Sequence, residues 1–121
     1  MKFAKVVFYA AGTWGVLSLT PLYFLFDAIG RQGGAPIAYP QFYYGFLAVT
    51  MAWQFAFFVI GSNPARFRLM MIPAVVEKFG YVVSLAMLYL QARIGAIDLM
   101  TAGPDALLGV LFTIAFVKTA A

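Results

Sequence analysis

Long apolar stretches with few charges constrain this chain more than any other feature. Residues 6–26, VVFYAAGTWGVLSLTPLYFLF, carry no charge and would form a helix about 31 Å long, close to the thickness of bilayer hydrocarbon. Comparable helices are expected at about 42–61, 66–92 and 104–120. Because 64% of the 121 residues are hydrophobic and only 10% are charged, a water-exposed domain of this size could not bury the apolar surface. We predict an all-α membrane protein.

The connections between these stretches indicate how the helices are arranged. Residues 27–41 are rich in Gly and Pro and predict a loop, and residues 94–103 predict another. Residues 62–68, SNPARFR, form a tight connector in which Ser62 or Asn63 caps a helix with Pro64 in its first turn. Short connections make neighbouring helices antiparallel, so the sequence predicts one domain, residues 1–121, folded as an antiparallel four-helix transmembrane bundle.

The Lys and Arg residues at the helix ends predict the orientation. Five of them fall on one side of the four stretches, and Arg31 and Arg93 fall on the other side with Asp27, Asp98 and Asp105; the five are Lys2, Lys5, Arg66, Arg68 and Lys118. The positive-inside rule then puts both termini in the cytoplasm. The first stretch is longer than the apolar core of a signal peptide, so we expect it to be retained as a span.

The composition also excludes several classes of site. The chain has no Cys and no His, which argues against disulfides, zinc sites and His-ligated haem, so no metal or cofactor is predicted. The net charge of +4 is scattered along the chain, so the expected partner is the lipid bilayer and not nucleic acid. No nucleotide-binding or hydrolase motif occurs, and no catalytic residue is assigned.

The charges of Glu77 and Lys78 stand inside the third apolar stretch. A carboxylate in hydrocarbon is costly and is by default a candidate functional site. Adjacent residues on a helix point about 100° apart, so Lys78 is not expected to pair with Glu77, and its long side chain is expected to reach the lipid headgroups instead.

A polar stripe around Glu77 is the candidate site for a ligand or a proton. Tyr81 and Ser84 share its helix face, and other helices offer matching polar or aromatic groups: Gln54, Trp53, Thr13 and Thr20. A structural role for this stripe, as hydrogen-bonded glue between helices, is favoured over a ligand site. At the outer ends, Asp27 and Arg93 are expected at one interface, where they could form a structural ion pair.

Four segments together resemble the pattern of small bacterial four-span inner-membrane proteins of unknown function. They are YPQFYYGF (39–46), AWQ (52–54), NPARFR (63–68) and MIPAVVEK (71–78). The resemblance covers most of the chain and implies a multi-pass protein of the bacterial inner membrane, without implying an activity.

Three hypotheses for function follow. The first is a non-enzymatic protein that binds a lipid-like or small apolar ligand, or a partner membrane protein, through the stripe around Glu77. The second is a small proton-coupled exporter similar to the small multidrug resistance proteins, although those carry their glutamate in the first helix and not the third. The third is an intramembrane isomerase, which needs a second acid–base group facing Glu77. Oligomerisation is left open.

Overall fold

The computed structural model describes residues 2–32 and 38–119, and within these ranges every regular element is a helix. Residues 33–37 of the connection at 27–41, and residue 120 of the fourth predicted helix, lie outside the described residues. Four helical runs are long and apolar enough to cross a membrane: Lys2–Phe24, Pro40–Ser62, Arg68–Leu90 and Ala96–Lys118. The predicted all-α class with four candidate spans is therefore confirmed for the described part of the chain.

The first run changes its helix type at a proline. The α-helix α1 (Lys2–Leu19) continues as the 3₁₀ helix η1 (Thr20–Phe24), with Pro21 near the start of η1. Proline lacks the N–H that an α-helix needs and so breaks its hydrogen-bond ladder. From α3 (Pro40–Ser62), the hydroxyl of Tyr43 donates a hydrogen bond to the carbonyl of Leu22 at 2.5 Å, which satisfies one acceptor in the irregular segment.

A short helix occupies the first part of the segment predicted as a loop at 27–41. The helix α2 (Phe26–Gln32) has Asp27 in its first turn and Arg31 in its last turn. Both charges are favourable in the field of the helix dipole, and a single glycine at position 30 is tolerated inside a helix. The expectation of a helix-free connection was therefore wrong for this part.

The third run begins later than its capping residues suggested. Asn63 does act as a capping residue, because its side-chain oxygen accepts a hydrogen bond from the backbone N–H of Arg66 at 3.3 Å. Residues 64–67 nevertheless form a turn, followed by η2 (Arg68–Met70) and then α4 (Met71–Leu90).

The fourth run is longer than the predicted stretch at 104–120. It consists of α5 (Ala96–Met100) and α6 (Gly103–Lys118), and it includes residues that were expected in the outer loop at 94–103. At its start the backbone N–H of Gly95 donates to the carboxylate of Asp98 at 3.4 Å, which caps α5. This run therefore carries Asp105 into the span.

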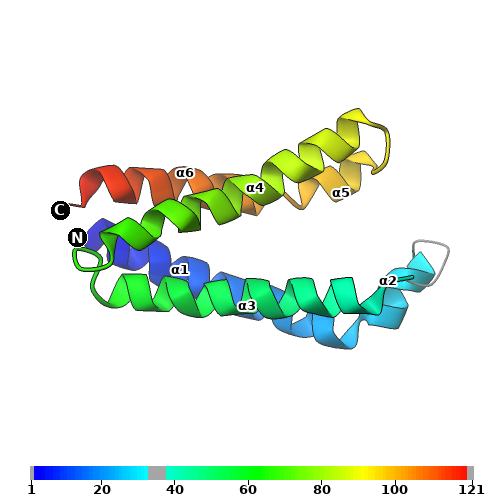
Figure 1. The fold of residues 1–121 in the computed structure, drawn as a ribbon, viewed down its shortest axis with the longest axis horizontal. Helices are drawn as coiled ribbons and strands as arrows, with labels where there is room; N and C mark the ends of the chain where they lie inside the picture. The colour runs from blue at the N-terminus through cyan, green and yellow to red at the C-terminus, as the bar shows by residue number, and fades with distance from the viewer. Residues whose placement is uncertain (1, 33–37, 120–121) are drawn as a thin grey trace.

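The helices pack as two pairs, α1 with α3 and α4 with α6, and contacts between α1 and α6 join the pairs. Figure 1 shows the pairs close together at the end where the N- and C-termini lie, and diverging toward α2 and the C-terminal end of α4. The closed end holds a core of three stacked or edge-on rings, Phe8, Phe57 and Phe112, with centroids 4.2 to 6.1 Å apart. The polar site lies further along the bundle from this core.

Glycines allow the helices of each pair to approach closely. A Cβ on Gly12 would lie 2.7 Å from the ring of Phe58, and one on Gly109 would lie 2.8 Å from the ring of Phe79. Each glycine thus allows an aromatic ring of the neighbouring helix to pack directly against the glycine backbone. The described chain is also apolar on its outside: Phe24, Leu90 and Ile97 are each more than 80% exposed, which suits a lipid environment.

Candidate ligand cavity

A cavity of about 480 Å³ lies between the two helix pairs. This volume is within the range of about 300–1,000 Å³ that is usual for small-molecule sites. All four candidate membrane-spanning runs contribute to its wall; the lining residues are Trp14, Gly15, Ser18, Leu19, Leu22, Phe46, Thr50, Gln54, Glu77, Lys78, Tyr81, Thr101, Pro104 and Asp105. Most of the wall is apolar or aromatic, and the charged groups come from α4 and α6.

Lys78 is at the centre of a three-charge cluster. Its ammonium nitrogen lies 3.3 Å from Asp105 Oδ1 and 3.7 Å from Glu77 Oε2, and it lies 5.1 Å from the ring centroid of Phe57. Only 4% of the residue is exposed. The prediction that Lys78 extends to the lipid headgroups was therefore wrong. Two carboxylates and an aromatic face offer its ammonium a better environment inside the bundle.

Asp105 is the partner that sequence reasoning missed. It was placed at the outer flank because the fourth span was expected to begin at residue 104. In the structure Asp105 lies in the first turn of α6, within the candidate span Ala96–Lys118 and roughly 20 Å from Lys118 along the helix axis. The apolar residues Ile97, Leu99 and Met100 ahead of it were the available signal that the span starts earlier.

Gln54 brings an unpartnered acceptor to the cavity. Its side-chain nitrogen donates to the carbonyl of Thr50 at 2.8 Å, which fixes the orientation of the amide. Its oxygen Oε1 is buried and has no hydrogen-bond partner among the described residues, and the residue is only 1% exposed. On the other side Gly15 leaves room for this amide, because a Cβ there would lie 1.8 Å from Oε1.

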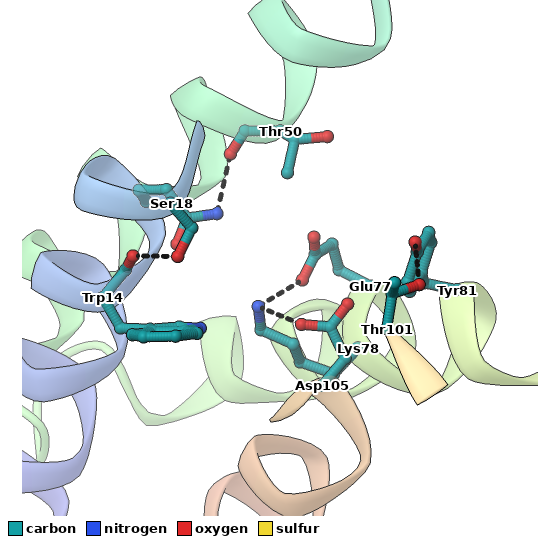
Figure 2. Close-up of polar contacts among 9 residues, drawn as sticks. Trp14, Ser18, Thr50, Glu77, Lys78, Tyr81, Thr101 and Asp105 are labelled. Atoms are coloured by element: carbon teal, nitrogen blue, oxygen red, sulfur yellow. Dashed lines mark hydrogen bonds and ion pairs between the residues drawn. The ribbon is translucent and has the colours of Figure 1, made fainter. Parts of the chain in front are cut away.

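Glu77 brings a second unpartnered acceptor. Its Oε2 is buried without a hydrogen bond among the described residues, although the ammonium of Lys78 is 3.7 Å away. A hydrogen bond to an ammonium is usually about 2.7–2.9 Å long, so this pair is an electrostatic contact and leaves the oxygen free to accept. Figure 2 shows Glu77, Lys78 and Asp105 converging on one point, with the indole nitrogen of Trp14 turned toward them from α1.

These polar groups lie at a similar depth. Counted along their helices from the end that carries both termini, Gln54 is roughly 12 Å from Ser62 and Glu77 is roughly 14 Å from Arg68. The cluster therefore belongs to the middle part of the candidate spans.

Three of the seven residues predicted for the stripe line the cavity: Gln54, Glu77 and Tyr81. The hydroxyl of Tyr81 is 3.2 Å from that of Thr101, and its ring stacks on Phe46 with centroids 6.4 Å apart. These contacts connect Tyr81 of α4 to α3 and to the turn between α5 and α6.

The other four predicted residues lie elsewhere. Trp53 packs against the core, 6.2 Å from the ring of Phe57. Thr13, Thr20 and Ser84 are exposed, and each donates to the carbonyl four residues earlier in its own helix. Such back-bonding satisfies a hydroxyl without a partner helix, so a polar residue at the right spacing need not face the bundle. Ser18 and Thr50, which were not singled out, line the cavity instead, and Ser18 does so although its hydroxyl also donates to a carbonyl of its own helix, that of Trp14.

The predicted ion pair of Asp27 and Arg93 is not formed. Within residues 2–32 and 38–119, the ion pairs are those of Lys78, and Arg93 instead donates to the side chain of Gln91 at 3.5 Å. Figure 1 gives the reason, since α2 and the C-terminal end of α4 belong to different helix pairs that have diverged at this end.

Comparison with known proteins adds no assignment: no protein-family model, curated protein or solved structure matches this chain.

Proposed function

We propose that this chain is a multi-pass protein of the bacterial inner membrane that binds a lipid-like or small apolar molecule in the cavity around Glu77. The observation that carries the proposal is the cavity itself. About 480 Å³ of space is lined in part by Gln54 and Glu77, and the oxygens Gln54 Oε1 and Glu77 Oε2 are buried without a partner among the described residues. An unsatisfied buried polar group costs about 1–3 kcal/mol, so a bound molecule that supplied hydrogen bonds would be stabilised there.

The proposal includes an antiparallel bundle with both termini in the cytoplasm. Both chain ends lie at one end of the molecule in Figure 1, and the charge distribution of the connections supports a cytoplasmic position for that end. An aromatic group at the opposite end, which includes Phe26, Tyr43 and Tyr44 with centroids 5.1 to 5.4 Å apart, suits the other interface.

The test uses Trp14 as a reporter, because its side chain lines the cavity. Substitution Trp53→Phe leaves Trp14 as the only tryptophan of the chain. The purified protein in phosphatidylcholine nanodiscs would be titrated with dodecylamine, while Trp14 fluorescence is recorded, and native mass spectrometry would identify what co-purifies. We expect a saturable change in Trp14 emission and a retained small molecule. A change that rises without saturation, together with an empty mass spectrum, would contradict the proposal.

Glu77→Gln and Ser84→Ala provide a matched pair on α4. Ser84 bonds to its own helix and does not line the cavity, so Ser84→Ala is expected to leave the titration unchanged. Glu77→Gln keeps the size of the side chain and is expected to weaken binding by about tenfold while the protein still folds. Equal titrations for the two variants would remove Glu77 from the site.

A proton-coupled exporter is a second candidate, favoured by the position of Glu77 on the cavity wall beside another carboxylate, Asp105. Such a carboxylate could exchange a proton for a cationic substrate. Growth of cells that express the chain would be compared on lipophilic cations, with and without Glu77→Gln. Resistance that depends on Glu77 would favour export over simple binding, and equal growth would remove it.

The isomerase hypothesis required a second acid–base group beside Glu77, and Lys78 now meets that requirement at 3.7 Å. Lys78 is however paired with two carboxylates and only 4% exposed, so its ammonium is already engaged within the protein. The binding function therefore stays the better supported of the three.

A further inference from the structure

The polar end of the cavity has buried hydrogen-bond acceptors without a donor among the described residues. Its unpartnered buried atoms within the described chain are both acceptors, Gln54 Oε1 and Glu77 Oε2. The amide nitrogen of Gln54 donates to Thr50, and the ammonium of Lys78 donates to Asp105. A ligand head that donates hydrogen bonds would therefore find two unpaired buried acceptors at this end.

From this arrangement we infer that the cavity selects an amphiphile with a hydrogen-bond-donating head, a primary ammonium in preference to an alcohol. The inference rests on the proposed binding function and names the chemistry of its ligand. An N–H or O–H head could donate to both orphaned oxygens, while a carboxylate, ester or ketone head could donate to neither.

The charges at this end favour the ammonium. Counted as ionised, Lys78 contributes one positive charge and Glu77 and Asp105 contribute two negative charges, so the cluster has a formal charge of −1. An ammonium would bring the cluster to neutrality in a low-dielectric environment, where an uncompensated charge is expensive. A carboxylate head would raise the imbalance to −2.

The aromatic wall supports the same assignment. Trp14, Phe46 and Tyr81 line the cavity together with the two acceptors, and ring faces attract cations at distances of up to about 6 Å. The site already uses this interaction once, since the ammonium of Lys78 lies 5.1 Å from the centroid of Phe57.

The acceptor of Gln54 lies against the backbone of α1. Thr50 fixes the amide through its nitrogen, and Gly15 provides the space that Oε1 occupies. This geometry belongs to the contact between α1 and α3 and does not depend on the charges on α4 and α6. It gives two separate ways to disturb the head site, through Gln54 and through Glu77.

The experiment compares dodecyl chains that differ only in the head. The full chain with Trp53→Phe in phosphatidylcholine nanodiscs is titrated with dodecylamine, dodecanol, dodecyl methyl ether, dodecanoate and dodecyltrimethylammonium. The change in Trp14 emission maximum and intensity is plotted against the membrane-bound fraction of each probe, which removes differences in partitioning. We expect dodecylamine to bind most tightly, dodecanol next, and the methyl ether about tenfold more weakly than the amine, because it cannot donate.

Two variants separate the head site from the rest of the cavity. Gln54→Met keeps the shape of the side chain and removes the acceptor, so the preference for amine over ether is expected to shrink. Thr13→Val removes a hydroxyl that bonds to its own helix outside the cavity, and the preference is expected to persist. If Gln54→Met fails to fold, the ranking of the five probes on the unmodified site still decides the matter.

Each outcome has a distinct meaning. Trimethylammonium binding as tightly as the amine would overturn the donor assignment, because charge alone would then be sufficient. Equal binding of amine, ether and carboxylate would overturn the selection of a head while leaving a binding cavity. Absence of a saturable change in Trp14 emission with any probe would instead overturn the proposed function itself.

Discussion

At the scale of single residues, Gly15 decides whether the cavity has its amide acceptor. A methyl group there would lie 1.8 Å from Gln54 Oε1, so the amide would have to leave its position. We expect Gly15→Ala to lower the free energy of unfolding by about 1–3 kcal/mol through overpacking, and to weaken binding of dodecylamine. Thermal unfolding in detergent and the Trp14 titration measure the two effects.

Gly45→Ala is the control for this substitution. Gly45 lies on α3, and a Cβ there would meet nothing within 4 Å. Alanine is the better helix former, so Gly45→Ala should leave stability unchanged or raise it by up to about 1 kcal/mol. If both variants behave alike, the close contact between Gly15 and Gln54 does not exist.

Lys78 is the residue whose loss should be most damaging. Lys78→Met would leave Glu77 and Asp105 together without their shared cation, which we expect to cost about 3–5 kcal/mol of stability. Replacing all three, as Glu77→Gln, Lys78→Met and Asp105→Asn, should recover most of that loss, since no uncompensated charge remains. A triple variant no more stable than Lys78→Met would contradict the cluster.

At the scale of elements, the C-terminus of α4 ends in a Schellman turn built on alanine. Ala92 has φ of 60°, the N–H of Arg93 donates to the carbonyl of Leu88 at 2.9 Å, and that of Ala92 donates to Tyr89 at 3.0 Å. Glycine adopts this conformation without steric cost, so Ala92→Gly should raise the free energy of unfolding by about 1 kcal/mol.

The matched control is Ala86→Gly, inside the same helix. There glycine should cost about 1 kcal/mol, because it loses more backbone entropy than alanine. Thermal or chemical unfolding of the two variants should therefore shift in opposite directions. Shifts of the same sign would mean that α4 does not end where the structure places its end.

The elements also show what could be predicted from the sequence. Hydropathy was sufficient to find the four candidate spans, because length and apolar composition are what define such a candidate. The short helix α2 was missed, because Gly30 was taken as a breaker and the favourable charges of Asp27 and Arg31 at its ends were not considered. The predicted helix start at Pro104 agrees with α6, which begins at Gly103, but the short helix α5 before it was missed because residues 94–103 were predicted to be a loop.

The candidate site was predictable only in part, for a similar reason. A carboxylate within an apolar stretch is easily recognised in the sequence as a candidate site. Glu77, Gln54 and Tyr81 do line the cavity. The pairing of Lys78 with Asp105 joins residues 27 positions apart, and depends on how α4 packs on α6, which spacing along one helix does not encode. Thr13, Thr20 and Ser84 were misassigned because their spacing does not reveal that each hydroxyl bonds to its own helix.

At the scale of the whole molecule, the orientation in the membrane can be measured with single cysteines. The chain contains none, so each introduced thiol is unique. Cysteines at Lys5 and Asn63 are expected to react with a membrane-impermeant maleimide only after cells are opened, and cysteines at Ala38 and Ile94 in intact spheroplasts. The reverse pattern would invert the proposed topology. Labelling of Lys5 and Asn63 from opposite sides would mean that the chain does not cross the membrane twice between these two positions.

The most direct measurement of the central claim, a polar-ended cavity between two helix pairs, compares thiols at the adjacent positions 17 and 18. Ser18 lines the cavity, whereas Leu17 is 68% exposed on the outside of α1 and does not line it. Since the thiolate is the reactive form and is suppressed in hydrocarbon, Ser18→Cys should react with a small charged methanethiosulfonate at least about tenfold faster than Leu17→Cys. Dodecylamine should slow the reaction at position 18 alone. Equal rates at the two positions, or a faster reaction at position 17, would mean that no such cavity exists between the helix pairs.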